Sequence, residues 1–136
     1  TAWQTSMKPY DDVIARITAV ASDKTFAASE PVFDYMADAL GLTNGTPKGY
    51  QDAALNESDP SPADIAEFEQ SLRDDKIDVL VYNTQTEGPT PEQIRGVADD
   101  ADVPVVDVTE TEPPGTTSFV TWQVDQLTAL ATALGA

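Results

Sequence analysis

The 136-residue sequence predicts a single α/β domain: an open, mostly parallel sheet of about four strands with helices on both faces. Short apolar runs alternate along the chain with segments whose apolar residues recur at helical spacing. The run Ile77–Asn83 is almost wholly apolar, which is typical of a strand buried on both faces of a parallel sheet. Strands separated by helices of roughly ten to fifteen residues indicate right-handed crossovers and a Rossmann-like arrangement.

The composition limits the chemistry that the chain can perform. It has no cysteine and no histidine, so disulfides, thiolate metal sites and imidazole bases are excluded. Asp and Glu number 24 against 7 Lys and Arg, and the net charge of −17 argues against nucleic acid or an anionic membrane as a partner. Cations are the natural small partners, although the same acidity also serves simply to keep a surface soluble. No signal-like or membrane-spanning apolar run is present, and the start at Thr1 fits a mature product or an excised domain.

The first half of the chain predicts a helix, a strand and a second helix. Lys8–Ala21 places apolar residues on one helical face, and Lys24–Ser29 forms a short strand. Pro31 suits the first position of the helix that ends at Gly41, which puts Glu30 at the N-cap. Glutamate is a poor cap, so its carboxylate is either presented for a function or is an ordinary exposed acid at a helix start.

Residues 43–60 are rich in turn formers and predict mostly loop, with either a short strand or a helical turn at Tyr50–Leu55. We expect the fourth strand of the sheet near Tyr50. Ser61 then caps a helix in a capping box with Asp64. A Glu69–Arg73 ion pair supports that helix.

After Ile77–Asn83, Thr90 and Gln93 predict another capping box, followed by a helix. Val103–Thr109 forms the next strand, and residues 110–115 form a proline-containing loop. The last helix runs from about Thr117 to Leu134.

The topology predicts where a site lies, because ligands of open parallel sheets bind beyond the carboxyl ends of the strands. The loops at that edge contain Glu30, Glu110 and Glu112. If Glu30 and Glu112 approached within about 5 Å, their repulsion would be about 3 kcal/mol at an effective dielectric of 20, which favours a cation between them. We therefore expect Glu30 and Glu112 to share an edge and to hold a metal ion.

Other functional motifs are scarce. The sequence has no GxGxxG after a strand, no phosphate-binding glycine-rich loop and no GxSxG elbow. Asp107, inside a strand, leaves a magnesium-dependent phosphoryl transferase as a less favoured alternative, but no paired aspartate and lysine accompany it. We expect Asn83 to satisfy backbone groups of the following loop. We expect Trp3, Trp122 and the four tyrosines to serve packing.

The segment from Glu30 through Phe33 and Tyr35 to Gly41-Leu42 resembles the start of the C-terminal lobe in solute-binding receptors of zinc and manganese ABC importers. The family pattern there is a His or Glu ligand, two residues, Phe, one residue, Tyr, and Gly-Leu six residues later. The resemblance continues through residues 59–62, 79–83, 103–106 and 109–115, so it covers nearly the whole chain from Lys24 onward.

The resemblance implies one half of a two-lobed, extracytoplasmic receptor that captures Zn²⁺ or Mn²⁺ between its lobes and is not an enzyme. Residues 1–22 correspond to the end of the long interdomain helix and 23–136 to the C-terminal lobe. The implied metal ligands are Glu30 and Glu112, and Glu110 is a substitute because the family has aspartate at the position of Glu112. The partners implied are the absent N-terminal lobe, which supplies two histidines, and the membrane subunits of an ABC importer. An independent acidic α/β binding or interaction domain is the alternative function.

Overall fold

A computed structural model of the chain describes residues 2–30, 33–85, 88–109 and 118–135. Four strands form one sheet in the order β2-β1-β3-β4, and all neighbouring strands are parallel. The strands are β1 (Thr25–Ala28), β2 (Thr43–Asn44), β3 (Val79–Asn83) and β4 (Val105–Val108). The helices are α1 (Ala2–Ala21), α2 (Asp34–Leu40), α3 (Lys48–Leu55), α4 (Pro62–Arg73), α5 (Pro89–Asp100) and α6 (Phe119–Leu134). The predicted fold class is confirmed.

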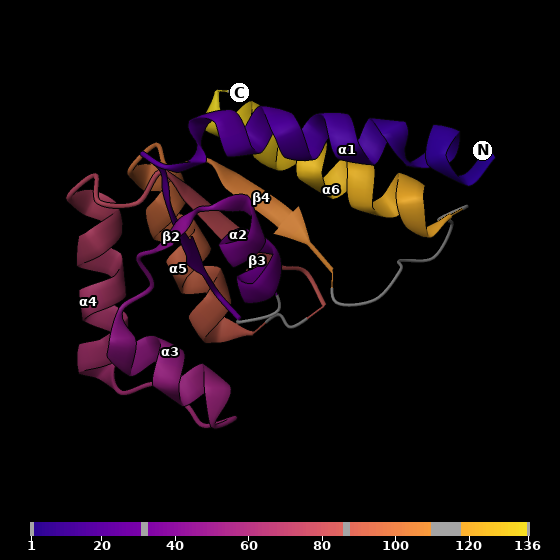
Figure 1. The fold of residues 1–136 in the computed structure, drawn as a ribbon. Helices are drawn as coiled ribbons and strands as arrows, with labels where there is room; N and C mark the ends of the chain where they lie inside the picture. Colours follow the sequence, from indigo (N-terminus) through magenta and orange to yellow (C-terminus); the bar gives the residue numbers. More distant parts are fainter. Residues whose placement is uncertain (1, 31–32, 86–87, 110–117, 136) are drawn as a thin grey trace.

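The sheet separates two apolar cores. Helices α1, α2 and α6 cover one face, where α1 and α6 lie side by side (Figure 1), and α3, α4 and α5 cover the other. Successive strand residues point to opposite faces, so Phe26 and Ala28 enter the first core while Ala27 enters the second. Because β1 and β3 are buried on both faces, their carboxyl ends form the centre of one edge of the molecule.

Helix α1 is longer than predicted: it begins at Ala2 rather than at Lys8 and continues through Pro9. A proline inside a helix removes one backbone hydrogen bond. The helix is stabilised instead by its packing, because Val13 and Ile17 are buried in the same core as Leu127 of α6. Among the described residues, no helix combines the length and the apolar character that a membrane span requires.

The start of α2 also differs from the prediction. The N-cap of this helix is Phe33, so the prediction that Glu30 caps it is wrong, and Pro31 lies outside the described residues. Phe33 is buried in the first core, and the packing of its ring fixes the start of the helix. The predicted end is confirmed, because Gly41 adopts the left-handed conformation (φ 83°) that favours glycine.

The region near Tyr50 is helical, so the prediction that the fourth strand lies there is wrong. That strand is β2, where Thr43 pairs with Thr25 of β1. Tyr50 and Ala53 of α3 are both buried, and a spacing of three residues places them on one helical face. The Tyr50 ring meets Phe68 of α4 edge-on, with the ring centroids 4.7 Å apart.

The predicted capping box of α4 is present. Ser61 Oγ accepts the N–H of Asp64 at 3.1 Å, and Asp64 Oδ2 accepts the N–H of Ser61 at 3.1 Å. The predicted ion pair between Glu69 and Arg73 is also formed, at 3.4 Å.

We expect Ser61→Ala to lower the free energy of unfolding by about 1 kcal/mol, because the variant loses the acceptor for an otherwise unpaired helical N–H. Urea denaturation measures this difference. Ser61→Asn is the matched control, since asparagine keeps a capping oxygen and should leave the midpoint nearly unchanged. Equal midpoints for Ser61→Ala and the unsubstituted protein would show that the cap does not contribute.

The capping box predicted for Thr90 and Gln93 is wrong. Helix α5 begins two residues before the predicted start at Pro91: Pro89 is its first residue and Gly88 is its N-cap. Pro89 fits the first helical position because its fixed φ matches a helix and its missing N–H needs no partner there. The Gln93 side chain instead donates a hydrogen bond to Glu69 of α4.

The remaining elements agree with the prediction apart from their ends. The predicted strands at 24–29, 77–83 and 103–109 are each present, but each observed strand is two or three residues shorter than predicted. Helix α6 begins at Phe119, where Ser118 Oγ caps the helix by accepting the N–H of Thr121 at 3.0 Å. Its predicted end is confirmed by Gly135, with φ 75°.

Candidate functional site

Glu30 lies two residues after the end of β1, at the carboxyl edge of the sheet, and is half-buried. It lies between two adjoining hollows, both of which also contact Tyr50. The larger has a volume of about 230 Å³ and extends toward Asp59 and the start of α5 at Gly88. The smaller includes Asp34 of α2. Glu30 therefore lies at a hollowed edge, as expected for a ligand-binding residue of an open parallel sheet.

The electrostatics around Glu30 are those of a negative, partly desolvated site. Burial raises the pKa of Tyr50 to about 12, and the negative charge of Glu30 contributes to the rise. Burial also raises the pKa of the Asp34 carboxyl. Such an environment favours a bound cation, because a positive charge offsets both the desolvation and the repulsion of the acids.

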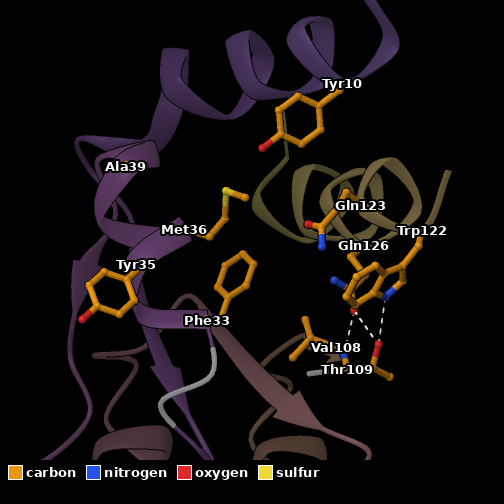
Figure 2. Close-up of a pocket in the computed structure, with 10 residues that line it drawn as sticks. All are labelled: Tyr10, Phe33, Tyr35, Met36, Ala39, Val108, Thr109, Trp122, Gln123 and Gln126. Atoms are coloured by element: carbon orange, nitrogen blue, oxygen red, sulfur yellow. Dashed lines mark hydrogen bonds between the residues drawn. The ribbon is translucent and has the colours of Figure 1, made fainter. Parts of the chain in front are cut away.

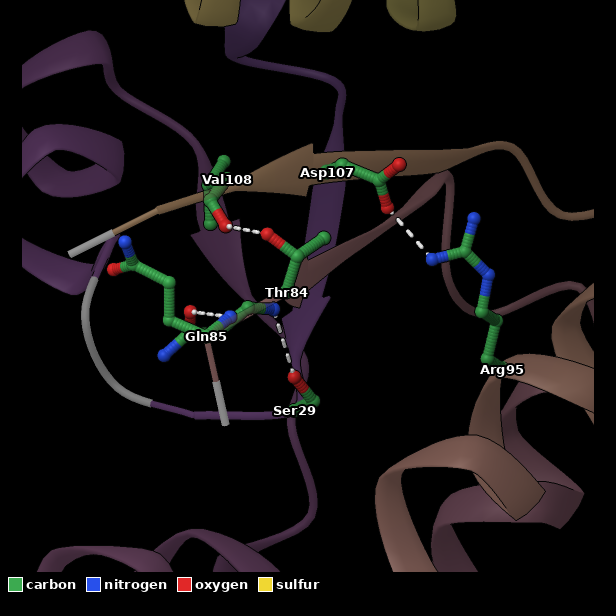
Figure 3. A network of polar contacts seen from close by, with 7 residues as sticks. Ser29, Thr84, Gln85, Arg95, Asp107 and Val108 are labelled. Atoms are coloured by element: carbon green, nitrogen blue, oxygen red, sulfur yellow. Dashed lines mark hydrogen bonds and ion pairs between the residues drawn. The ribbon is translucent and has the colours of Figure 1, made fainter. Parts of the chain in front are cut away.

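The backbone that leads into Glu30 is held by buried polar contacts. Ser29 and Asn83 are almost completely buried, and Ser29 Oγ accepts the N–H of Asn83 at 3.2 Å (Figure 3). Asn83 Oδ1 in turn accepts the N–H of Gln85 at 2.9 Å, which confirms that Asn83 satisfies the loop after β3. Thr84 Oγ1 donates to the carbonyl of Val108, so the ends of β3 and β4 are also joined. The loops that leave β1, β3 and β4 thus share one rigid edge.

The other two predicted ligands, Glu110 and Glu112, lie outside the described residues, so their distance from Glu30 stays a prediction. The last described residue before them is Thr109, which leaves β4 at the same sheet edge as Glu30. Its N–H donates to Gln126 Oε1 at 2.6 Å, and its Oγ1 accepts from Trp122 Nε1 at 2.8 Å (Figure 2). Helix α6 therefore fixes the point from which the chain proceeds to Glu110.

A cavity of about 420 Å³ lies beside Thr109, between α1, α2 and α6 (Figure 2). Tyr10, Phe33 and Trp122 line it together with the amides of Gln123 and Gln126. Sequence reasoning assigned Trp122 to packing and did not identify its hydrogen bond to Thr109. Tyr35 lies at the rim and is 94% exposed, so the expectation that all four tyrosines serve packing is wrong for this residue.

Asp107 lies on the edge strand β4 and is paired with a cation. Its Oδ1 accepts from Arg95 Nη1 of α5 at 2.7 Å (Figure 3), and the Arg95 guanidinium lies 4.7 Å from the centroid of the Tyr82 ring. This ion pair raises the pKa of Arg95. The contacts of Asp107 thus join β4 to α5 and indicate a structural role.

Within residues 2–30, 33–85, 88–109 and 118–135, no three acidic side chains are close enough together to hold a metal ion. The described residues therefore do not form a complete metal site around Glu30, although Asp34 and Asp59 line the same hollows. A complete coordination sphere needs ligands from elsewhere, since structural and catalytic zinc sites use at least three protein ligands.

The comparisons with known proteins agree with this architecture. The family model described as "Zinc-uptake complex component A periplasmic" (ZnuA) matches residues 1–133. A search of curated proteins found no match.

Several solved structures share the fold. The laminin-binding protein of Streptococcus agalactiae, described as an adhesin with metal-transporting activity, has a TM-score of 0.68 at 19% identity, over 93% of this chain and 46% of its own. FpvC of Pseudomonas aeruginosa, in complex with Mn²⁺, has a TM-score of 0.68 at 17% identity, over 98% and 49%. Zn(II)-bound AdcAII of Streptococcus pneumoniae, an H205L variant, has a TM-score of 0.64 at 17% identity, over 96% and 47%.

This chain spans about half the length of these proteins. The sequence match covers almost all of the chain, and the parallel sheet with its two helical layers is the fold that these structures share with it. The chain belongs to the ZnuA family, zinc-uptake complex component A, periplasmic.

Proposed function

We propose that this chain is the C-terminal half of an extracytoplasmic receptor that captures Zn²⁺ or Mn²⁺ between two lobes and delivers it to an ABC importer. The observation that carries the proposal is the family match over residues 1–133. Three of the similar solved structures are described as bound to Mn²⁺, Zn(II) or Cd, which supports a divalent cation as the ligand. Since they are about twice as long as this chain, we assign residues 1–22 to the end of an interdomain helix and residues 23–136 to the C-terminal lobe.

Glu30 is the ligand of this lobe with the best geometric support. It is half-buried at the carboxyl edge, where a bound cation would reduce the repulsion between neighbouring negative charges. Glu112, or Glu110 in its place, is the proposed second ligand, and the other lobe supplies the remainder. Carboxylate oxygens are harder ligands than imidazole, so Glu30 shifts the preference toward Mn²⁺, while Zn²⁺ accepts both types.

The proposed action is binding and release without turnover. A receptor needs a cleft that captures and releases a cation, whereas a phosphoryl transferase needs positioned phosphate-binding groups. The partners of the chain are the other lobe, the metal ion and the membrane subunits of the importer.

We expect Glu30→Gln in the two-lobed receptor to weaken zinc and manganese binding by about 10- to 1,000-fold with the fold intact, because glutamine keeps the size of the side chain but not its charge. Calorimetric titration with each metal measures the change. Glu67→Gln on α4 is the matched control: it removes the same charge from an exposed helical position and should leave the affinity unchanged. Unchanged affinity in Glu30→Gln would contradict the assignment of this ligand.

A further inference from the structure

The residue before Glu30 is held by three hydrogen bonds. Ser29 is 0% exposed, and its N–H donates to the carbonyl of Val81 at 3.1 Å. Its Oγ accepts the N–H of Asn83 at 3.2 Å, and its carbonyl accepts the Tyr50 hydroxyl at 3.1 Å. Each polar atom of this serine thus contacts a different group of β3 or α3.

The pattern shows how β1 ends. In a parallel ladder, the residue whose N–H donates to Val81 would also accept, at its carbonyl, the N–H of Asn83. Here Ser29 Oγ replaces that carbonyl, and the carbonyl itself is turned out of the ladder toward Tyr50. The serine side chain therefore completes the sheet while the main chain turns away from it.

The direction of that carbonyl determines where Glu30 lies. A peptide unit is planar, so the Ser29 carbonyl and the N–H and Cα of Glu30 move together as one rigid group. A hydrogen bond that holds the carbonyl of Ser29 consequently holds the Cα atom from which the Glu30 side chain extends.

Tyr50 is itself rigid enough to serve as this anchor. It is buried, and its ring meets Phe68 edge-on across the contact between α3 and α4. The loop that leads into α3 is tied to the same strand, because Thr46 Oγ1 accepts the N–H of Ala28 at 3.0 Å. Helix α3 and the loop that precedes it thus hold two consecutive residues, Ala28 at the end of β1 and Ser29 directly after it.

We propose that Tyr50 is a positioning residue for the metal ligand Glu30 and that it acts through the carbonyl of Ser29. The proposal rests on the proposed function, since it assumes that Glu30 binds the metal. Tyr50 contributes its hydroxyl to the backbone and does not coordinate the ion. The removal of groups that orient a metal ligand commonly lowers metal affinity by about 10- to 100-fold.

Tyr50→Phe in the two-lobed receptor tests this role, because it removes the hydroxyl and keeps the ring that packs on Phe68. We expect the affinities for zinc alone and for manganese alone, measured by calorimetry well below the unfolding temperature, to fall by about 10-fold or more. Ile77→Val is the control for a general loss of stability. Ile77 is buried in the same core as Tyr50 but precedes the amino end of β3, at the end of the sheet opposite to Glu30. The Ile77→Val receptor should therefore bind each metal with the affinity of the unsubstituted receptor.

A double-substitution cycle distinguishes positioning from a merely structural role. If Tyr50 acts through Glu30, then Tyr50→Phe should have little further effect on affinity once Glu30→Gln is present. Equal fold-losses in both backgrounds would overturn the proposal, as would unchanged affinity in Tyr50→Phe while Glu30→Gln binds weakly. Unchanged affinity in Glu30→Gln would instead overturn the proposed metal site, and the positioning role with it.

Discussion

Separated from the other lobe, this chain should bind zinc or manganese with dissociation constants of about 10⁻⁴ to 10⁻³ M, the range of weakly caged oxygen sites. The two-lobed receptor should bind the same ions at least about 1,000-fold more tightly. The reason is the number of ligands: in the proposed receptor each lobe contributes about half of the coordination, and closure of the cleft removes water from the ion. This is the largest effect that we expect, because the absence of the other lobe removes half of the proposed ligands at once.

Calorimetry on both forms measures the difference, with a competing chelator for the two-lobed receptor and circular dichroism to verify that the isolated lobe is folded. The isolated lobe with Glu30→Gln is the control, and its residual affinity should be weaker still. Micromolar or tighter binding by the isolated lobe would contradict the prediction, because it would require a complete site within this half.

Most of the fold could be predicted because local signals and tertiary packing agree. The apolar run at Ile77–Asn83 became a strand whose five ladder residues are all buried, and Ser61 with Asp64 marked the start of α4 correctly. The errors occur where local signals conflict. Tyr50 lies in a segment rich in turn formers, and its helix is stabilised by burial against Phe68. At α5, Pro89 and Pro91 both suit the first helical position, and the helix begins at the earlier one, Pro89.

The site could be predicted only in part. Topology alone placed Glu30 at the carboxyl edge, since a strand and its following loop are contiguous in sequence. The hydrogen bonds that hold the preceding residue, Ser29, were not predictable. Their partners, Tyr50 and Asn83, are 21 and 54 residues away along the chain. Hydrogen bonds of this kind depend on the packing of α3 and β3 and leave no local sequence pattern.

The second large effect concerns salt. We expect the free energy of unfolding to rise by about 3 to 6 kcal/mol between about 0.1 and 1 M NaCl, with an increase in Tm of roughly 10 to 20 °C. A net charge of −17 destabilises the compact state by self-repulsion, and the Debye length falls from about 10 Å to about 3 Å over this range. The four ion pairs formed by the described residues, all involving exposed or partly exposed side chains, oppose this trend only weakly.

Urea denaturation at a series of NaCl concentrations measures the effect. Chloride is preferable to sulfate, which also stabilises proteins through its exclusion from apolar surface. The variant Asp100→Asn/Asp102→Asn tests the cause: both residues are exposed, and Asp100 ends α5, where a negative charge opposes the helix dipole. The variant should be more stable than the unsubstituted chain at low salt, and the difference should shrink at 1 M. Stability that is flat or falls with NaCl would contradict self-repulsion as the cause.

The two outer strands of the sheet, β2 and β4, have a consequence for how copies of this chain meet in solution. On one side, β2 offers only two residues, and on the other, β4 carries the exposed Asp107, which is paired with Arg95. A strand from another molecule needs a long, apolar and uncharged edge with which to pair. Neither edge provides one, and the acidic surface keeps neighbouring molecules apart. Concentrated solutions of the folded lobe should therefore resist fibrillar aggregation by strand addition.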